Sequence, residues 1–509
     1  MKTGNWRSLL RSEKKDRTPE VPVMMPQSAE QSTGWTEERI RQLFDKCADV
    51  TIKRYELGGP DQRQPLLTVS CDGMTDVKQM NEYVLPRLER MTYESTFDPT
   101  QHAELALTRF ERTKEIITRV FSGQLVLYFI KLQQWFALDI SDPPKRMPME
   151  SNTELSIKGP RDGFIEELQT NVALVRKRLR TNSLRYEQFT IGKKSESKVA
   201  LLYIEGFARQ DFVDEARKRL QHLELEVLFS SAQLEEALSD SSYTLFPLLT
   251  YSGRPDFVVD CLIRGRFAII ADGAPIAVIA PVNLTLLLKS PEDIYFPFPI
   301  VTFELMIRMA GLLIALYLPG FWIALASFNL EQIPFPLLAT LVVTRLGLPL
   351  PGPLEAFLML GLFELFREAG VRLPKAVGQT IAVVGGIVVG DAVIRAGLAS
   401  TTMLIVAAIT AVATFTLVNQ TLSSAVSIIR LLVMICAATL GMYGFILALI
   451  AIVLHLSKLQ SFGVPYLTPM SPTRPKDLFA ALFQRPLRHE ANRPQFLQSE
   501  DANSRGGDS

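Results

Sequence analysis

The pattern of apolar and polar positions changes character near residue 300. Before that point, short apolar runs alternate with stretches whose apolar positions recur at helical spacing. This alternation predicts strands followed by amphipathic helices. After that point, long apolar runs follow one another as far as residue 457, and such runs predict membrane-spanning helices. The pattern therefore predicts an α/β cytosolic region of two subdomains, followed by an all-α polytopic membrane domain.

The two-subdomain prediction rests on an order of patterns that occurs twice. A strand-like run, 66–71 or 199–204, precedes an acidic residue with a glycine, a helix-period stretch, and a strand pair that begins with glycine. The two leading glycines are Gly123 and Gly265. True duplication and chance similarity both account for this order, and either one predicts two α/β subdomains.

Proline and charge mark the boundaries between the regions. Residues 1–35 combine proline with mixed charge, which is typical of a disordered arm. Three prolines within 142–148 prevent a helix and separate the two subdomains. The predicted domains after the arm are 36–142, 149–295, a membrane domain over 300–457, and a basic, partly disordered cytosolic tail over 458–509.

Four stretches of the membrane domain are long and apolar enough to span a bilayer. They are 309–328, 376–394, 401–418 and 431–456. A further apolar region, 334–366, contains a proline-rich break at 349–353 and predicts a re-entrant, broken-helix element. The basic tail favours the cytosol, so both chain ends lie inside and four crossings are expected. Five crossings result if the broken element passes through the membrane.

Charge and composition matter here through their distribution along the chain. Lys plus Arg total 54 and Asp plus Glu total 53, so the net charge of +1 excludes a nucleic-acid binder that acts through bulk positive charge. Only 13 of these charged residues lie between Val301 and Leu456. The first residues show no apolar signal-peptide core, so we expect the large N-terminal region to stay in the cytosol.

Cysteine and histidine give no sign of a metal or cofactor site. The four cysteines form no CxxC pair, and the four histidines are scattered. No nucleophile–base pairing is visible either. We therefore expect neither an enzyme nor a bound cofactor or metal.

The polar residues of the membrane domain are the candidate functional residues. Ionisable groups at membrane depth are costly and usually face a protein interior or a pore. The candidates are Glu355, Glu364, Arg367 and Glu368 around the broken element, and Gln379, Asp391 and Arg395 in the small-residue span. Two interpretations are open. In the first, Asp391 pairs with Arg395, and Glu364 pairs with Arg367 or Glu368 with Arg372, at the membrane interface. In the second, the group lines a pore or gate.

One helix of the second subdomain, predicted over 164–180, ends in a run of cations. Arg176, Lys177, Arg178 and Arg180 complement the negative end of the helix dipole. We interpret them as a solvated helix end. A contact to an anion or a lipid headgroup is the alternative.

Several longer motifs resemble one known family. They are GRFAIIADGAPIAVIAP (Gly265–Pro281), FREAGVRLPKAVGQTIAVVGGIVVGDA (Phe366–Ala392), SFGVPYLTP (Ser461–Pro469), LLYIEGFA (Leu201–Ala208) and DGMTDVKQMNEYVLPRL (Asp72–Leu88). On these motifs the sequence resembles the GerA family, the A subunits of bacterial spore germinant receptors. The resemblance extends in order over most of the chain.

This resemblance implies a multi-pass protein of the inner spore membrane, with its large N-terminal region on the core side. It also implies a transporter-like B subunit and a lipoprotein C subunit as partners. The A subunits would form a homo-oligomer around a pore that nutrient binding opens to monovalent cations. Membrane lipid is a further expected partner, and nucleic acid is not.

The sequence departs from the family at positions that bear on ions. Similar proteins usually carry Glu where Leu360 stands, Gln where Asp391 stands and Glu where Arg395 stands, so ion preference and subunit pairing are open. Two other functions are open as well: a SpoVAF-type accessory channel paralogue, and a secondary transporter that binds the nutrient itself. The hydrophobic half shows no inverted repeat, which argues against the transporter.

Overall fold

The chain forms two compact units, each with its own architecture. The computed structural model describes residues 35–58, 63–92, 105–144, 154, 156–241, 243–372, 390–472 and 497. The first unit comprises Met1–Leu238, Tyr251–Pro281 and Arg485–Ser509, and the second comprises Ser239–Thr250 and Val282–Gln484. Almost all of the predicted arm, 1–35, and most of the predicted tail, 458–509, lie outside the described residues.

The first unit begins with a sheet of strand order β1-β2-β4-β5-β3, in which neighbouring strands pair antiparallel. Its strands are β1 (Val50–Leu57), β2 (Gln64–Cys71), β3 (Thr108–Phe110), β4 (Leu125–Phe129) and β5 (Gln134–Leu138). Its helices are α1 (Glu37–Leu43), α2 (Val77–Gln79), α3 (Leu85–Thr92) and α4 (Thr113–Val120). A short π-helix, Met80–Val84, joins α2 to α3.

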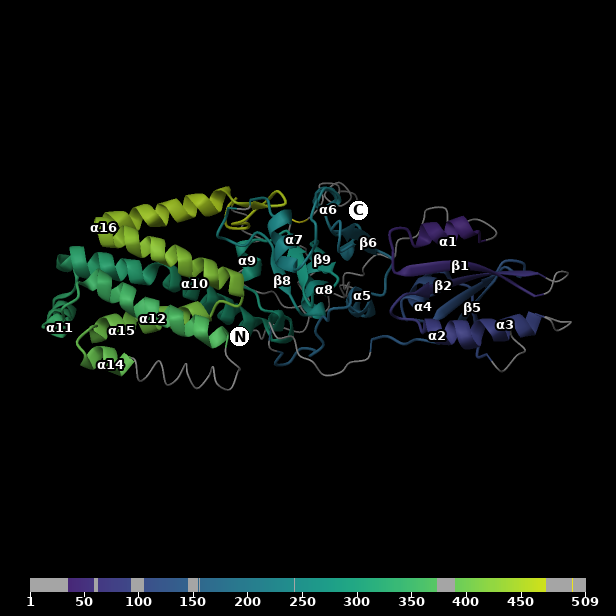
Figure 1. Ribbon diagram of the computed structural model, residues 1–509, viewed down its shortest axis with the longest axis horizontal. Helices are drawn as coiled ribbons and strands as arrows, with labels where there is room; N and C mark the ends of the chain where they lie inside the picture. Colours follow the sequence, from purple (N-terminus) through teal and green to yellow (C-terminus); the bar gives the residue numbers. More distant parts are fainter. Residues whose placement is uncertain are drawn as a thin grey trace, which may run out of the picture. The chain divides into compact units, whose positions relative to one another are not determined.

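Helices cover both faces of this sheet (Figure 1). One apolar cluster joins α1 and α4 to the sheet, and a second joins the stretch from α2 to α3 to the opposite face. Leu67 and Val69 of β2 belong to the first cluster, whereas Leu66 belongs to the second. A strand that is buried on both faces excludes charged side chains, which explains why 66–71 contains none and why Thr68 and Ser70 are buried.

The second sheet repeats the topology of the first, with strand order β6-β7-β9-β10-β8. Its strands are β6 (Leu184–Ile191), β7 (Ser197–Ile204), β8 (Thr250–Ser252), β9 (Phe267–Ala271) and β10 (Ala277–Ala280). Its helices are α5 (Leu168–Arg178), α6 (Gln210–Gln221), α7 (Ser231–Leu238) and α8 (Pro255–Ile263). The prediction of two α/β subdomains is confirmed, and each contains the same succession of strands and helices.

The repeat extends to one backbone detail at the glycine-led strands. Gly123 before β4 and Gly265 before β9 have φ of +89° and +93°. A Cβ on Gly123 would collide with the carbonyl oxygen of Met74, and one on Gly265 with that of Phe207. Met74 and Phe207 each follow the acidic-glycine turn of their own subdomain. Both subdomains therefore use glycine for the same close approach between two backbone segments.

The second unit consists mainly of helices. They are α9 (Leu284–Leu287), α10 (Phe298–Phe328), α11 (Phe335–Arg345), α12 (Gly352–Arg372), α14 (Gly390–Arg395), α15 (Thr401–Phe415) and α16 (Gln420–Lys458). A small hairpin, β11 (Gln460–Ser461) with β12 (Val464–Pro465), follows α16. Within the described residues, α10 and α16 are long and apolar enough to cross a membrane.

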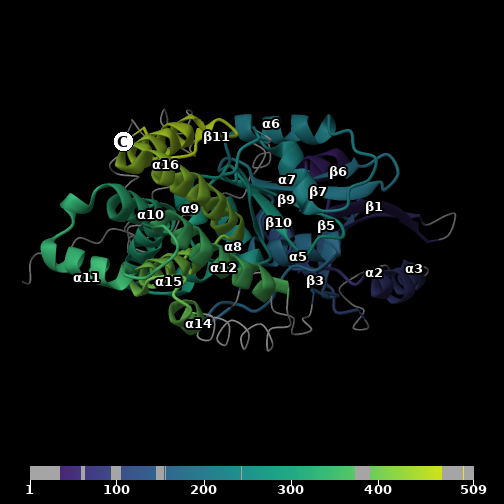
Figure 2. The same ribbon diagram turned by 60° about the vertical axis from the view of Figure 1, so that its left-hand side comes forward.

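The helix α16 reverses its direction at Gly441, which has φ +62° and ψ −141°. Its first arm, 420–440, ends beside the last residue of α10, because Gly441 faces the ring of Phe328. Its second arm, 442–458, returns along α10, where Phe445 lies 5.7 Å from Phe321 between ring centroids. Figures 1 and 2 both show the two arms.

This reversal corrects the prediction of one span over 431–456. The helix begins at Gln420, and Gly441 divides it into two arms. Gly441 lies inside an uninterrupted apolar run, so hydropathy alone does not reveal the turn. The backbone conformation at this position is one that glycine adopts without steric penalty.

The proline-rich break lies where the sequence places it, but the helix after the break is longer than expected. Residues 346–351 are not helical, and α12 then continues for 21 residues to Arg372. A helix of this length measures about 31 Å, which matches the hydrocarbon thickness of a bilayer. The region 334–366 therefore contains one short helix, α11, and most of one long helix, α12. It does not consist of two short helices of similar length. Charged side chains near its end shorten the apparent apolar run.

The other predicted spans compare with the helices as follows. The stretch 309–328 is the second part of α10, and 401–418 corresponds to α15. The stretch 376–394 lies outside the described residues except for the part within α14.

The two ends of the helical unit are bonded to each other. The backbone N–H of Val282, before α9, donates to Oγ of Ser461 in β11 at 3.0 Å. The amide of Asn283 donates to the carbonyl oxygen of Thr468 at 2.9 Å. The segment that leads into the first long helix is thus joined to the segment that leaves the last one.

Candidate functional site

Charged and hydroxyl side chains meet between α12, α15 and α16. We call this group the arginine cluster; its members are Glu364, Arg367, Thr414, Ser423, Ser427 and Arg430. On α16, Ser423, Ser427 and Arg430 recur at spacings of four and three residues, which places them on one face of the helix. On α12, Glu364 and Arg367 are neighbours one turn apart.

One carboxylate in this cluster serves two guanidinium groups. Glu364 forms ion pairs with Nη2 of Arg367 and, at 3.3 Å, with Nη2 of Arg430. Arg367 also donates to Ser423 and Ser427 at 3.3 and 3.0 Å. Arg430 donates to Ser427 at 3.3 Å, and to the hydroxyl of Thr414 at 3.0 Å. The cluster therefore links three helices through two cations and a single anion.

The hydroxyl groups act as acceptors toward the arginines. Ser427 donates its own proton to the carbonyl oxygen of Ser423 at 3.2 Å, and Thr414 donates to that of Thr410 at 2.8 Å. Their lone pairs are left for the guanidinium N–H groups. Arg430 is only 5% exposed, and its Nε has no acceptor in the part of the chain that the structure describes. Donors exceed acceptors at this position.

Glu355 lies at the opposite end of α12 and has a different role. It is 1% exposed, and its Oε1 accepts from the backbone N–H of Ser400 at 2.6 Å and from the Ser400 hydroxyl. Ser400 is the N-cap of α15. The helix dipole stabilises a carboxylate at this position. Glu355 thus joins the first turn of α12 to the start of α15.

Of the remaining predicted residues, only Glu368 and Arg395 have described side chains, and neither takes part in the described contacts of these two groups. Glu368 and Arg395 are exposed. Gln379 lies outside the described residues, and Asp391 lies in α14, although its side chain is not among those described. The structure therefore brings Glu364 and Arg367 together and separates Glu355 from them.

Sequence reasoning missed Arg430, which is the more buried of the two arginines in the cluster. The signal was present in the spacing of Ser423, Ser427 and Arg430, which makes one polar face on a helix that begins after Asn419. Asn419 caps α16 through its side chain. Apolar content alone places the start of the predicted span at 431, after this polar face.

In the first unit, the cations at the end of α5 have separate roles. Arg176 is fully buried, and its Nε and Nη2 donate to the two carboxylate oxygens of Asp49 at 2.8 and 2.9 Å. Its Nη1 donates to the carbonyl oxygens of Thr181 and Leu184 at 2.9 and 3.0 Å. Its guanidinium stacks on Phe121 at 4.1 Å. The interpretation of a solvated helix end is therefore wrong for Arg176.

This ion pair belongs to a seam between the two subdomains, formed by residues 43–49 and 176–186. Tyr186 of β6 donates its backbone N–H to Lys46 at 2.9 Å and accepts from Ala48 at 3.1 Å. The Asn182 amide donates to the carbonyl oxygen of Leu43 at 3.2 Å. Main-chain pairing and a buried ion pair thus fasten the subdomains to each other.

The segment that leads into the second subdomain carries a buried carboxyl group, Glu154. It accepts from the hydroxyl of Ser252 at 2.7 Å and from the backbone N–H of Gly253 at 3.2 Å. Burial raises the pKa of Glu154 to about 7, although the Ser252 hydroxyl and the charge of Arg254 both lower it. This group therefore titrates near neutral pH.

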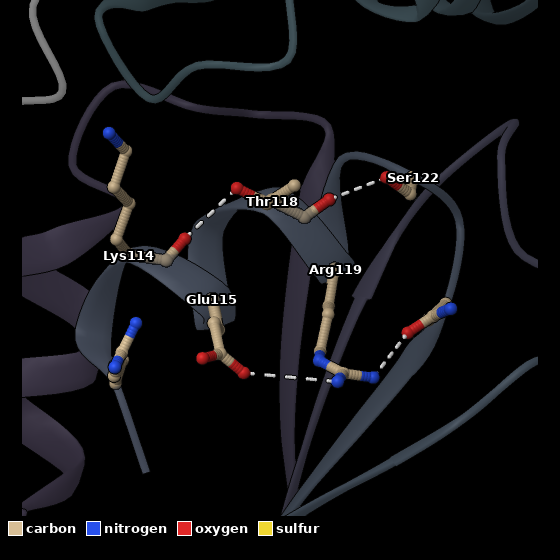
Figure 3. A pocket seen from close by; sticks show the side chains of 7 residues that line it. Lys114, Glu115, Thr118, Arg119 and Ser122 are labelled. Atoms are coloured by element: carbon tan, nitrogen blue, oxygen red, sulfur yellow. Dashed lines mark hydrogen bonds and ion pairs between the residues drawn. The ribbon is translucent and has the colours of Figure 1, made fainter. Parts of the chain in front are cut away.

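An open hollow of about 550 Å³ lies on the surface of α4 (Figure 3). Figure 3 shows the guanidinium of Arg119 facing Glu115, and the two groups are 3.8 Å apart. Nη1 of Arg119 also donates to Oε1 of Gln124 at 3.1 Å. The hydroxyls of Thr118 and Ser122 donate to carbonyl oxygens of their own helix. Because these groups satisfy one another, we assign no ligand to the hollow.

No group of three metal-ligating side chains occurs among the residues that the structure describes, and the four cysteines are free. The arginine cluster in particular does not suit a metal ion, because its two guanidinium groups outnumber its carboxylate.

Comparison with known proteins concerns both units. Residues 38–496 match the family described as Bacillus/Clostridium GerA spore germination protein. The chain belongs to the GerA family. This membership confirms the family resemblance that the sequence motifs carry.

This GerA-family chain is similar to its relatives over almost its whole length. It is 38% identical over 472 residues to spore germination protein XA of Bacillus anthracis, covering 91% of this chain and 96% of that protein. It is 34% identical over 472 residues to spore germination protein B1 of Bacillus subtilis (strain 168), covering 91% and 97%. It is 33% identical over 451 residues to the uncharacterized membrane protein YfkQ of the same organism, covering 87% of each. With its two long apolar helices, the GerA-family chain is a membrane protein.

Among solved structures, the GerA-family chain is similar to the N-terminal domain of the A subunit of the Bacillus megaterium spore germinant receptor GerK3. The sequence identity is 23% and the TM-score is 0.38. The similarity covers 48% of this chain and 93% of that domain.

Proposed function

We propose that this GerA-family chain is the A subunit of a spore germinant receptor in the inner spore membrane. In this proposal it assembles with copies of itself, a transporter-like B subunit and a lipoprotein C subunit. Nutrient binding then opens a path for monovalent cations through the helical units. Membership of the family over residues 38–496 carries the proposal. The charged groups between α12, α15 and α16 support the ion path, because such groups at membrane depth usually face an interior or a pore.

Contacts within the helical unit support six crossings of the membrane in place of the four expected from hydropathy. At one end of the bundle, the contacts are Ser327 with Gly352, Glu355 with Ser400, and Phe328 with Gly441. At the other end, Gly311 of α10 faces Thr416 after α15. The helices α10, α12 and α15 and both arms of α16 run between these ends. The end of α12 and Ser400 lie toward opposite ends of this bundle, so six crossings require one further passage of the chain between them.

Cysteine labelling distinguishes four crossings from six. With six crossings, Ala396→Cys lies on the face of the membrane opposite the chain termini, and a membrane-impermeant maleimide labels it from that side. With four crossings, the same position lies on the side of the termini. Leu346→Cys is the control, because both topologies place it opposite the termini. Labelling of Ala396→Cys only from the side of the termini would refute six crossings.

Ion flux from potassium-loaded liposomes that contain the full chain tests the channel. We expect cation efflux, and we expect Glu364→Gln to reduce it several-fold because two arginines are then left without a counter-charge. Glu331→Gln, in the turn after α10, is the matched control and leaves the flux unchanged.

Two results would contradict this function. Equal flux through the wild type and Glu364→Gln would mean that the arginine cluster has a structural role and does not affect the ion path. Saturable uptake of one nutrient without cation flux would identify a secondary transporter.

A further inference from the structure

The arginine cluster contains two positive charges and one negative charge. Arg367 and Arg430 share a single carboxylate, that of Glu364, in the part of the chain that the structure describes. The segment 373–389 contains no acidic residue in its sequence, so it offers no second carboxylate. A buried charge without a partner is strongly unfavourable. A further anion at this position would therefore stabilise the folded protein.

Two other described carboxylates of the helical unit, those of Glu355 and Glu304, have contacts outside the cluster. Glu355 accepts from Ser400 at the opposite end of α12. Glu304 pairs with Arg308 at 3.0 Å within α10. Glu368 is exposed, and the described contacts of the two arginines in the cluster do not include it. Among the contacts that the structure describes, no second carboxylate therefore pairs with Arg367 or Arg430.

The cluster is open on one side and closed on the other. The side chains of Glu364 and Arg367 are 38% and 21% exposed, whereas that of Arg430 is 6% exposed. The unused donors are guanidinium N–H groups, including Nε of Arg430. Guanidinium groups bind the oxygens of phosphate and carboxylate groups through charge-assisted hydrogen bonds. An oxyanion that enters beside Arg367 meets donors and positive charge.

The depth of the cluster suits the phosphate of a lipid headgroup. Arg367 lies five residues before the end of α12. This corresponds to about 7–8 Å along the helix axis. Arginine side chains extend along a helix toward the membrane surface, so the Arg367 guanidinium comes within reach of the headgroup layer. Basic sites between membrane helices recognise anionic headgroups in this way.

We propose that the arginine cluster binds a phosphate group, with Arg367 as the outer contact and Arg430 as the buried one. The headgroup of an anionic phospholipid and free inorganic phosphate share this chemistry. The assignment goes beyond ion conduction and does not depend on it, because it requires only the contacts within one helical unit.

Native mass spectrometry of the full chain in detergent tests the assignment. The probes are phosphatidylglycerol, phosphatidylcholine as the zwitterionic comparison, and inorganic phosphate. We expect retention of phosphatidylglycerol in preference to phosphatidylcholine. We expect Arg367→Gln to weaken phosphatidylglycerol binding about five- to tenfold, the effect of one lost cation near the headgroup. Lys458→Gln removes one positive charge from the exposed last turn of α16, outside the cluster, and leaves binding unchanged.

The remaining variants and outcomes decide the source of the anion. Arg430→Lys keeps the charge but loses the planar fork, so phosphatidylglycerol binding weakens and its preference over phosphatidylcholine persists. Binding of inorganic phosphate that Arg367→Gln weakens, without any lipid preference, supports a free anion as the occupant. Equal phosphatidylglycerol and phosphate binding by the wild type and Arg367→Gln overturns the proposal. Loss of oligomers in Arg367→Gln without any change in anion binding also overturns it, and points to a carboxylate from a neighbouring copy.

Discussion

Arg176 in the first unit and Arg430 in the second are both buried arginines, but their surroundings differ. Arg176 contacts both oxygens of the Asp49 carboxylate, two carbonyl oxygens and the ring of Phe121. Arg430 contacts one oxygen of a carboxylate whose other oxygen pairs with Arg367, together with two hydroxyls, and its Nε lacks an acceptor in the described part of the chain. The first site is complete within one chain. The second site contains a guanidinium N–H donor for which the described helices supply no acceptor.

This difference separates a structural pair from a functional candidate. A buried charge that is fully paired contributes mainly to the specificity and integrity of the fold. A buried charge that is only partly paired indicates a ligand, a partner or a moving element. Burial alone does not distinguish the two cases, whereas counting the partners of each donor does.

The largest effect that we expect comes from breaking the complete pair. Asp49→Asn leaves the Arg176 charge without a counter-charge in the seam between the subdomains. Its free energy of unfolding should fall by about 3–5 kcal/mol. Denaturant unfolding of the full chain in detergent gives this value, and hydrogen exchange should locate the opening at residues 43–49 and 176–186.

A neighbouring ion pair supplies the matched control. Arg178 on the same helix pairs with Asp162 at 2.7 Å, and both side chains are 21% exposed. Asp162→Asn should cost only about 0–1 kcal/mol, since solvent screens this pair. If Asp49→Asn and Asp162→Asn cost the same, the distinction between a complete buried pair and an ordinary surface pair would fail.

A smaller effect concerns Glu154, whose described contacts are the Ser252 hydroxyl and the Gly253 backbone N–H and include no bidentate arginine. Burial raises its pKa from an ordinary 4.5 to about 7, so the folded state holds a proton that the unfolded state has released. The free energy of unfolding should therefore fall as pH rises from about 4.5 to about 7, by at most on the order of 3 kcal/mol. Glu154→Gln should flatten this part of the stability–pH curve.

The control for this pH dependence is a second glutamate. Burial also raises the pKa of Glu235 to about 7. Glu235→Gln should therefore remove a separate, additive part of the same slope. If Glu154→Gln leaves the slope of stability against pH unchanged, the carboxyl of Glu154 does not hold a proton in the folded state at neutral pH.

The central strands and the edge strands of the two sheets show what the sequence reveals about the fold. The strand-like runs 66–71 and 199–204 lie in β2 and β7, where burial on both faces leaves mainly apolar and no charged residues. The edge strands β1 and β6 were missed. Their sequences, VTIKRYEL and LRYEQFTI, mix charged with apolar residues because each edge strand is partly exposed.

In the candidate site, too, the sequence predicts some contacts and not others, and the distance along the chain decides which. Glu364 and Arg367 lie three residues apart, so helical spacing predicts their contact. The partners of the buried arginines lie far along the chain: Asp49 is 127 residues from Arg176, and Glu364 is 66 residues from Arg430. Only the folded arrangement reveals such pairs. Spacing alone marks each of these arginines as an ordinary surface cation.

The bonds that join Val282 and Asn283 to the chain after α16 have a mechanical consequence. They fasten the start of the helical unit to its finish, and the reversal at Gly441 is what brings the finish back to that point. A tilt of α10 is therefore transmitted directly to the returning arm of α16, without passing through the helices between them. The hydrogen bonds close the helical unit into a loop, so a displacement of one helix can reach another through the chain in either direction.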